Sequence, residues 1–333
     1  MDKSKQRLLN LVDRFAGQRI AVWGDFILDE YVYGKTRRIS REAPVLILTY
    51  QKKEFSLGGA GNSTLNLKAL GACPLPIGVV GQDESGQIIF GILRNLKIPT
   101  KYLLKLKVYP TPIKTRILAG EENTRKQQIL RIDSEFRVPE NGRLKRSLRR
   151  SIREARDQCS ALLISDYNYQ SVKEDIFQEI IPDYRKAHCP VTLDSRYRLL
   201  AFKGITAATP NEPEVEDALK TEIGENIPLL KRAGNSLMIK IQSPALLITR
   251  GSRGMALFEK GKTPLLIPVH GTTDIVDVTG AGDTVISVFT LALAGGADYQ
   301  EAAQLANYAG GIVVMKKGTA TLTADELKQA ISS

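Results

Sequence analysis

The sequence predicts an α/β fold with a central, mostly parallel sheet, helices on both of its faces, and a second, smaller sheet. Three observations support this prediction. From residue 161 onwards, short apolar runs alternate with helical stretches, which is typical of parallel strand–helix–strand units. Two glycine-rich turns each open a helix. Finally, segments between residues 31–50 and 113–132 are extended without helical periodicity, which indicates a separate sheet.

The composition is that of a globular chain that can bury a large core. The 333 residues are 43% hydrophobic and 25% charged, and we find no internal repeat or linker, so we expect one domain over residues 1–333. The net charge is 47 − 36 = +11. Such a charge is compatible with nucleic acid, a membrane surface or an anionic metabolite as the partner.

The densest basic cluster helps to choose between these partners. Cations at residues 143–156 alternate with Leu144, Leu148 and Ile152 at helical spacing, which indicates the solvated face of an amphipathic helix. A polyanion-binding patch is the alternative. Because no aromatic residues interleave with the cluster and no nucleic-acid-binding motif occurs, we expect neither nucleic acid nor a membrane as the partner.

The cysteines and histidines indicate neither a disulfide framework nor a metal centre. Cys73, Cys159 and Cys189 are odd in number and lack CxxC spacing, which favours a reducing compartment. His188 and His270 are isolated from any second ligand or nucleophile pattern. The N-terminal stretch reads as an amphipathic helix, and no apolar run is long enough for a bilayer, so we predict a cytoplasmic protein.

The first half of the chain supplies both predicted sheets. A strand at residues 19–23 ends at Gly24 and Asp25, which brings a carboxylate to the edge where α/β proteins bind ligands. Extended segments, a basic turn at residues 35–38 and a hairpin around a polar turn at residues 120–123 form the smaller sheet. Between them, the turn at residues 57–62 opens a helix, followed by a strand at 76–80 and a helix at 84–96.

The second half supplies the rest of the central sheet. Strands are predicted at residues 161–164, 191–193, 205–208 and 245–249, and helices at 176–184, 212–219, 300–315 and 324–331. Polar residues follow the strands, and we expect them to line one crevice because parallel strands end at the same edge. They are Ser165 and Asp166, Asp194 and Arg196, Thr209 and Asn211, and Thr249 and Arg250.

The segment around which we organise the prediction is Asp277-Val278-Thr279-Gly280-Ala281-Gly282-Asp283-Thr284, ahead of an apolar helix at residues 285–293. Small residues at a helix start leave backbone N–H groups uncovered, and the helix dipole adds positive potential, so the turn predicts an anion site. Asp283 is either a favourable N-terminal charge or a proton acceptor beside a phosphate. A tight connection without a ligand is the alternative interpretation. Neither a Walker A loop nor a GxGxxG motif is present.

Together with the turn at residues 58–62 and the NxxE motif Asn211-Glu212-Pro213-Glu214, this segment resembles the signatures of the ribokinase/PfkB family of carbohydrate kinases, in the same order and spacing. The resemblance runs from about residue 20 to the end of the chain. It implies a ribokinase-like three-layer α/β/α fold with a central, mostly parallel sheet and a small β-sheet lid, formed by segments at about residues 31–50 and 108–135.

Within the family, the stretch from Gly24 to Pro44 is similar to the D-glycero-β-D-manno-heptose 7-phosphate kinases, including the kinase half of the bifunctional heptose kinase/adenylyltransferase. This likeness implies ATP-dependent phosphorylation of heptose 7-phosphate at the anomeric hydroxyl, which gives the 1,7-bisphosphate. One alternative is a kinase for another sugar, sugar phosphate or nucleoside. Another is a non-catalytic sugar or nucleotide sensor, against which the intact Asp283 speaks.

Three departures leave the sugar open. Soon after the Asp-Tyr pair the branch has a lysine and a glycine, whereas this chain has Asn168, Tyr169 and Gln170. It has Ser40-Arg41-Glu42 where the branch has a proline in the middle. It also has Asp194-Ser195-Arg196 where the branch has Asp-Pro-Lys, and an arginine does not replace a lysine neutrally because its planar fork prefers different oxygen geometry.

The resemblance also implies roles for individual residues. Asp283 would be the general base that takes the proton of the sugar hydroxyl, and the amides of Gly280, Ala281 and Gly282 would stabilise charge on the transferring phosphoryl group. Asn211 and Glu214 would hold Mg²⁺ through water. The nucleotide would be lined by Thr249, Arg250, Gly251 and Asn307.

On the acceptor side, the resemblance assigns the sugar to Asp25, Gly58, Gly59, Asn62, Asp166 and Asp194. Arg38, Arg116 and Arg131, with Arg37 and Lys114, would bind the sugar's own phosphate or else form a solvated lid surface. Asp277, near Gly318, is the candidate for a monovalent-cation site, with K⁺ as the ion. The family also predicts a homodimer formed through the lid.

Overall fold

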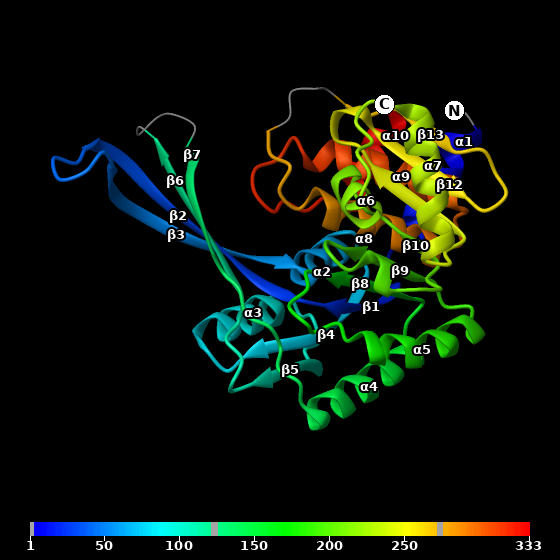
Figure 1. Cartoon of the computed structure of the whole chain (residues 1–333), viewed down its shortest axis with the longest axis horizontal. Helices are drawn as coiled ribbons and strands as arrows, with labels where there is room; N and C mark the ends of the chain where they lie inside the picture. Colours follow the sequence, from blue (N-terminus) through cyan, green and yellow to red (C-terminus); the bar gives the residue numbers. More distant parts are fainter. Residues whose placement is uncertain (1–2, 121–125, 272–275) are drawn as a thin grey trace.

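The computed structural model describes residues 3–120, 126–271 and 276–333, and its strands and helices form two sheets with flanking helices (Figure 1). The strands are β1 (Arg19–Gly24), β2 (Phe26–Ile39), β3 (Leu46–Gly59), β4 (Cys73–Gly81), β5 (Tyr102–Leu106), β6 (Ile113–Gly120), β7 (Gln127–Ser134), β8 (Ala161–Asp166), β9 (Val191–Ser195), β10 (Ala207–Ala208), β11 (Ala245–Thr249), β12 (Met255–Glu259) and β13 (Leu265–Ile267). The α-helices are α1 (Lys3–Asp13), α2 (Ala60–Ala69), α3 (Glu84–Asn95), α4 (Gly142–Arg156), α5 (Glu174–Lys186), α6 (Glu212–Leu219), α7 (Ile227–Lys240), α8 (Ala281–Ala294), α9 (Tyr299–Val313) and α10 (Ala324–Ser332).

The large sheet has the strand order β13-β12-β11-β10-β9-β8-β1-β4-β5 within the described residues. Its strands from β5 to β11 pair in parallel, whereas β11, β12 and β13 pair antiparallel. The predicted mostly parallel sheet is therefore confirmed. The analysis of the sequence did not identify β5, β12, β13 or α7. Only a short 3₁₀ turn at Gly251–Arg253 separates β11 from β12, so the chain reverses without a crossover helix.

Alternating side chains of the central strands divide the core into two layers. Ile20 and Val22 of β1 pack into the core under α1, α2, α3, α8, α9 and α10. Ala21 and Trp23 of the same strand pack into the other core, under α4, α5, α6 and α7. Because successive residues of a strand point to opposite faces, both faces of an apolar strand are buried, and the three-layer arrangement follows.

The small sheet has the order β3-β2-β6-β7 and reaches away from the main body in Figure 1. β2 follows β1 after Asp25 alone, so the two sheets are joined directly. The basic turn predicted at residues 35–38 is wrong, because Lys35, Arg37 and Arg38 lie within β2 and the turn falls at residues 40–45. A strand that is exposed on both faces has no alternation of apolar and polar residues, so its sequence resembles that of a loop. Most of the turn predicted at residues 120–123 lies outside the described residues.

The basic cluster of residues 143–156 forms α4, as predicted, and its charges are paired across the surface with α5. Arg149 and Arg153 both contact Glu179, at 2.6 and 2.7 Å, and Lys145 contacts Asp175 at 3.1 Å. The face therefore carries much less net charge than its sequence suggests. Among the described residues, no helix is both long and apolar enough to cross a bilayer.

Candidate active site

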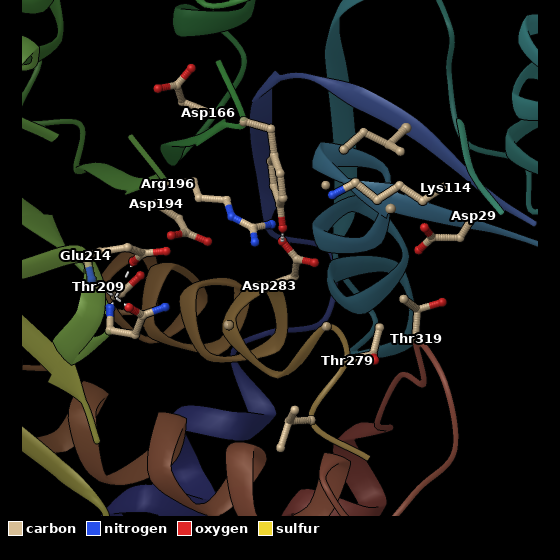
Figure 2. A pocket seen from close by; sticks show the side chains of 18 of the residues that line it. Asp29, Lys114, Asp166, Asp194, Arg196, Thr209, Glu214, Thr279, Asp283 and Thr319 are labelled. Atoms are coloured by element: carbon tan, nitrogen blue, oxygen red, sulfur yellow. Dashed lines mark hydrogen bonds between the residues drawn. The ribbon is translucent and has the colours of Figure 1, made fainter. Parts of the chain in front are cut away.

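A cavity of roughly 420 Å³ lies at the carboxyl ends of the central strands, beside the small sheet and the start of α8 (Figure 2). Asp166 and Asp194 reach it from the ends of β8 and β9, and Thr209 and Thr249 from the ends of β10 and β11. Of the residues that the sequence assigned to the site, the following line this cavity: Gly58, Gly59, Arg116, Arg131, Asp166, Asp194, Asn211, Glu214, Thr249, Gly280, Gly282 and Asp283.

Two helices, α2 and α8, meet at the cavity without side-chain caps. Their N-cap residues are Gly59 and Gly280, with φ of 57° and 79°, a region in which glycine is favoured. A Cβ on Gly280 would lie 2.5 Å from the side-chain nitrogen of Asn62, so the two helix starts touch. The positive ends of both helix dipoles therefore act on one space. The amide of Ala281 already donates to the carbonyl of Val278 at 3.2 Å.

Asp283, in the first turn of α8, is buried and held from two sides. The side-chain N–H of Asn62 donates to its Oδ2 at 2.8 Å, and the hydroxyl of Tyr167 donates to its Oδ1 at 3.3 Å. Burial, and next the negative charge of Asp194, raise the pKa of Asp283 to about 8, against the two hydrogen bonds that lower it. Such a carboxylate can exchange a proton near neutral pH.

Asn211 and Glu214 form a capping box at the start of α6. The Asn211 side chain accepts the Glu214 N–H at 2.8 Å, and the Glu214 side chain accepts the Asn211 N–H at 2.9 Å. Both residues nevertheless line the cavity. Burial raises the pKa of Glu214 to about 7, and burial together with Glu214 and Asp166 raises the pKa of Asp194 well above its usual range. The partly buried carboxylates of Asp194 and Glu214 therefore repel each other, which favours a cation beside them.

Four cations line the cavity, and two of them are neutralised by carboxylates. Arg116 contacts Asp29 at 2.7 Å, and Arg131 contacts its neighbour on β7, Asp133, at 2.9 Å. The side chains of Lys114 and Arg196 form no ion pair or hydrogen bond within the described residues. Lys114 is only 7% exposed, and burial, followed by repulsion from Arg196, lowers its pKa. Figure 2 shows Asp283 between them, with Lys114 and Asp29 on one side and Arg196, Asp194 and Glu214 on the other.

Asp25, predicted to bind the sugar, lies beneath the cavity instead of lining it. Its Oδ2 accepts the backbone N–H groups of Tyr167 and Tyr169, at 2.9 and 3.0 Å, and its Oδ1 accepts that of Ser171 at 2.9 Å. Burial, and next the charge of Asp166, raise the pKa of Asp25 to about 6. In this position Asp25 shapes the loop at residues 167–171. Asp29, four residues later on β2, is the carboxylate that faces the cavity.

A second, smaller cavity of about 160 Å³ shares Thr249, Val278 and Gly282 with the first. Its lining includes Gly251 and Asn307, both predicted to contact the nucleotide, together with apolar residues such as Met255 and Val285. It also includes Ala281, whose amide was predicted to stabilise the phosphoryl group. The Asn307 side chain donates to the carbonyl of Pro268 at 2.8 Å. A flat apolar base next to a phosphate site fits this arrangement.

Besides Asp25, the predicted residues Asn62, Arg38, Arg250 and Asp277 lie in neither cavity, and the Asn62 side chain is bound to Asp283 instead. The Arg250 side chain is buried against Glu212 at 2.7 Å, with Arg253 on the same carboxylate. Arg38 is exposed near the outer end of β2. Asp277 lines a separate groove beside the small sheet, and its carboxylate accepts the N–H groups of Thr279 and Gly318, both at 2.9 Å. Burial raises the pKa of Asp277, but the hydrogen bonds from Thr279 and Gly318, together with the charge of Arg116, outweigh burial, so the pKa is lowered.

Asp29 and Tyr167 are among the cavity residues that were not assigned to the site from sequence. Asp29 sits inside an alternating strand, so its only signal is a carboxylate four residues after Asp25. Tyr167 was quoted for its likeness to the family, but its contact with Asp283 depends on the path of the loop. Asp166 was assigned correctly to the cavity edge, yet its carboxylate is occupied by Arg198 and by the Ser195 hydroxyl at 2.7 Å.

The comparison with protein families decides the identity. Residues 18–326 match the model of the pfkB family of carbohydrate kinases. The chain belongs to this family. This carbohydrate kinase is also 38% identical over 318 residues to the bifunctional protein HldE of Desulfatibacillum aliphaticivorans, and 35% identical over 324 residues to that of Syntrophotalea carbinolica. These alignments cover 95% and 97% of the chain but only 64% and 65% of the relatives, so the chain spans less than two thirds of their length.

Solved structures support the fold of this carbohydrate kinase. Arabidopsis thaliana ribokinase, complexed with ribose and ATP, superposes with a TM-score of 0.72 at 20% identity, covering 96% of this chain and 99% of that one. Phosphofructokinase-2 from Escherichia coli, in complex with potassium, superposes with a TM-score of 0.71 at 16% identity, covering 95% and 98%. The ribokinase-like fold expected from the sequence is therefore confirmed.

Proposed function

We propose that the chain uses ATP to phosphorylate a sugar phosphate, with heptose 7-phosphate as the acceptor and its anomeric hydroxyl as the attacking group, giving the 1,7-bisphosphate. The observation that carries the proposal is a pair of cations, Lys114 and Arg196, on either side of the buried Asp283, which have no carboxylate partner in the part of the chain that the structure describes. The likeness to proteins named HldE supports the heptose branch.

The two cations face different parts of the cavity. Lys114 is on β6 of the small sheet, near Asp29, so we assign it to the acceptor's own phosphate. Arg196 follows β9 on the side of Asp194 and Glu214, so we assign it to the transferring phosphoryl group. An unpaired buried ammonium is costly, and a phosphate dianion offsets that cost, whereas a free sugar does not.

The reaction follows from the position of Asp283. Its carboxylate accepts the proton of the anomeric hydroxyl as that oxygen forms a bond to the γ-phosphorus of ATP, and the bond between this phosphorus and the bridging oxygen breaks to release ADP. The uncapped start of α8 stabilises the negative charge on the phosphoryl oxygens. The smaller cavity holds the adenine. The small sheet, as a lid, excludes water from the phosphoryl group.

The donor set of the cavity fits Mg²⁺. Within the described residues no group of three or more histidine, cysteine or acidic side chains forms a metal site, and the available donors are carboxylate and amide oxygens. Mg²⁺ keeps several waters and is usually held by one or two carboxylates plus substrate phosphates. Glu214 and Asn211 would hold Mg²⁺ through water, and the bound ion would neutralise charge on the phosphates of ATP. Asp277 is proposed to organise a K⁺ site beside Gly318, which a titration of turnover with KCl against NaCl tests.

Acceptor screening tests the proposal. ADP release is measured with heptose 7-phosphate, the unphosphorylated heptose, fructose 6-phosphate and ribose, and ³¹P NMR identifies the new phosphate as anomeric or not. We expect turnover with heptose 7-phosphate and a much lower kcat/KM with the free heptose. Preference for an unphosphorylated sugar or a nucleoside would contradict the proposal, and so would a product phosphorylated elsewhere.

A matched pair of variants tests the phosphate assignment. Lys114→Gln should raise KM for the sugar phosphate roughly 10-fold to 100-fold, because a charge-assisted hydrogen bond is lost, and leave KM for ATP nearly unchanged. Lys53→Gln is the control, since Lys53 lies on β3 of the same sheet and pairs with Glu30 at 3.1 Å. A rise in KM for ATP instead would place Lys114 on the nucleotide.

We also propose that two copies of the chain pair through the small sheet. Large apolar side chains are exposed on its strands and connecting turn: Ile39, Val45, Leu46, Tyr50, Ile129, Leu130 and Ile132. Such a cluster on one sheet is typical of an interface. Light scattering should give a dimer for the wild type, a monomer for Ile132→Lys, and a dimer for Ile239→Lys, which changes an exposed residue of α7. A monomeric wild type at micromolar concentration would contradict the pairing.

A further inference from the structure

Tyr167 lies between the small sheet and Asp283, on a loop that Asp25 fixes from below. Three backbone N–H groups, those of Tyr167, Tyr169 and Ser171, donate to the two oxygens of Asp25 at 2.9–3.0 Å. A carboxylate that accepts three amides leaves the loop little freedom to move. The phenol of Tyr167 is therefore presented to the cavity in a defined direction.

The Tyr167 hydroxyl completes the support of Asp283. It donates to Oδ1 at 3.3 Å, while Asn62 donates to Oδ2 at 2.8 Å, so both oxygens have a donor and the carboxylate cannot rotate without losing one. Donors to the ionised form favour that form. The remaining charged groups nearest Asp283 are Asp194 and Asp29, which oppose its ionisation, and the cation Arg196, which faces the same cavity.

The ring of Tyr167 is also covered by a cation of the small sheet. The ammonium of Lys114, on β6, lies 5.0 Å from the ring centroid. A cation over a ring draws electron density from it, which makes the phenol hydroxyl a stronger donor. The position of β6 therefore affects how strongly the Tyr167 hydroxyl donates to Asp283.

We propose that Tyr167 is a positioning residue for Asp283, which holds the carboxylate in the orientation that accepts the proton and favours its ionised form, and that Lys114 makes this support depend on the small sheet. The inference rests on the proposed role of Asp283 as the base. Since burial and Asp194 raise the pKa of Asp283 to about 8, each lost donor moves it further from neutrality.

The first test is the pH profile of kcat/KM between pH 6 and 10 for Tyr167→Phe and its control Tyr169→Phe. Tyr169 is bound by the same Asp25, but its hydroxyl donates to Glu135 at 2.7 Å. We expect the acid limb to move upward by roughly half to one pH unit in Tyr167→Phe, with 3-fold to 10-fold lower activity at pH 7 and recovery above pH 9. The control should not move. An unmoved limb in Tyr167→Phe would overturn the inference.

The second test does not need turnover. Carboxyl ¹³C NMR on aspartate-labelled protein, assigned by the signal missing in Asp283→Asn, gives the titration midpoint of Asp283 directly. The midpoint should rise in Tyr167→Phe and, by less, in Lys114→Gln. An unchanged midpoint in Tyr167→Phe overturns the positioning role, and an unchanged midpoint in Lys114→Gln overturns the link to the small sheet. A raised midpoint in a protein without kinase turnover would reject the proposed function alone.

Discussion

Replacement of Asp283 by asparagine should abolish most turnover and yet make the protein more stable. The carboxyl is buried, and its pKa rises from 3.8 to about 8 on folding, so between these values the folded state holds a proton that the unfolded state has released. The stability of the wild type therefore falls as pH rises through this window. Asparagine cannot ionise, so the stability of the variant does not fall in this way as pH rises.

The size of the effect follows from the shift. Linkage predicts an upper limit to the gain of about 2 kcal/mol at pH 5 and about 6 kcal/mol at pH 9. For a chain of 333 residues, these gains correspond to Tm differences of about 3 °C and about 8 °C. Loss of a general base should lower kcat by about 10²-fold to 10⁴-fold, while the sugar phosphate still binds.

Scanning calorimetry from pH 5 to 9 measures the stability, and ADP release and sugar-phosphate titration measure function. Asp217→Asn is the control, because Asp217 is exposed on α6. The difference in Tm between this variant and the wild type should not increase with pH. If the Tm of Asp283→Asn is lower than that of the wild type, or exceeds it by the same amount from pH 5 to 9, the burial argument is refuted. Turnover within tenfold of the wild type would refute the role as base.

Three further variants separate structural from functional parts of the site. Glu214→Ala should raise the Mg²⁺ concentration needed for half-maximal turnover and lower stability by ~1 kcal/mol, because it removes the capping box of α6. Glu301→Ala removes the equivalent capping box of α9, so it should lower stability by a similar amount without changing the Mg²⁺ dependence. Arg250→Met should lower stability by about 2 kcal/mol in chemical unfolding, since the buried Glu212 then keeps only the more exposed Arg253 as its partner, with KM for ATP unchanged. Gly280→Ala should reduce kcat/KM by at least about tenfold, because the added Cβ would clash with the side-chain amide of Asn62, which binds Asp283. Gly261→Ala is the control: its φ is 80° but no atom lies near the added Cβ, so only stability should change. In each case equal behaviour of a variant and its control, or a raised KM for ATP in Arg250→Met, would contradict the assignment.

The central sheet could be predicted because its strands are buried on both faces, which leaves apolar runs that stand out between helices. The small sheet was harder, since β2 and β3 continue into exposed, charged stretches where burial imposes no pattern. The antiparallel end of the large sheet was missed because β12 follows β11 too closely for a helix to mark the reversal.

The site shows the same division. Asp283 and Glu214 could be predicted, since each stands at a helix start with recognisable neighbours. Asp25 and Asp29 could not be told apart, because both follow the first strand and only the hydrogen bonds of the loop at residues 167–171 decide which one faces the cavity. Arg250 was assigned to the nucleotide from the family resemblance, whereas its side chain pairs with Glu212, which lies 38 residues earlier.

The attachment of the loop at residues 167–171 to Asp25 uses only main-chain amides. The bonds that fix the loop therefore do not depend on which side chains it carries, although Asn168 and Gln170 lie at φ of 66° and 71°, where few residue types are favoured. Of this loop only Tyr167 lines the cavity, so the one side chain that reaches the reacting groups is placed by main-chain bonds that substitutions elsewhere in the loop leave in place.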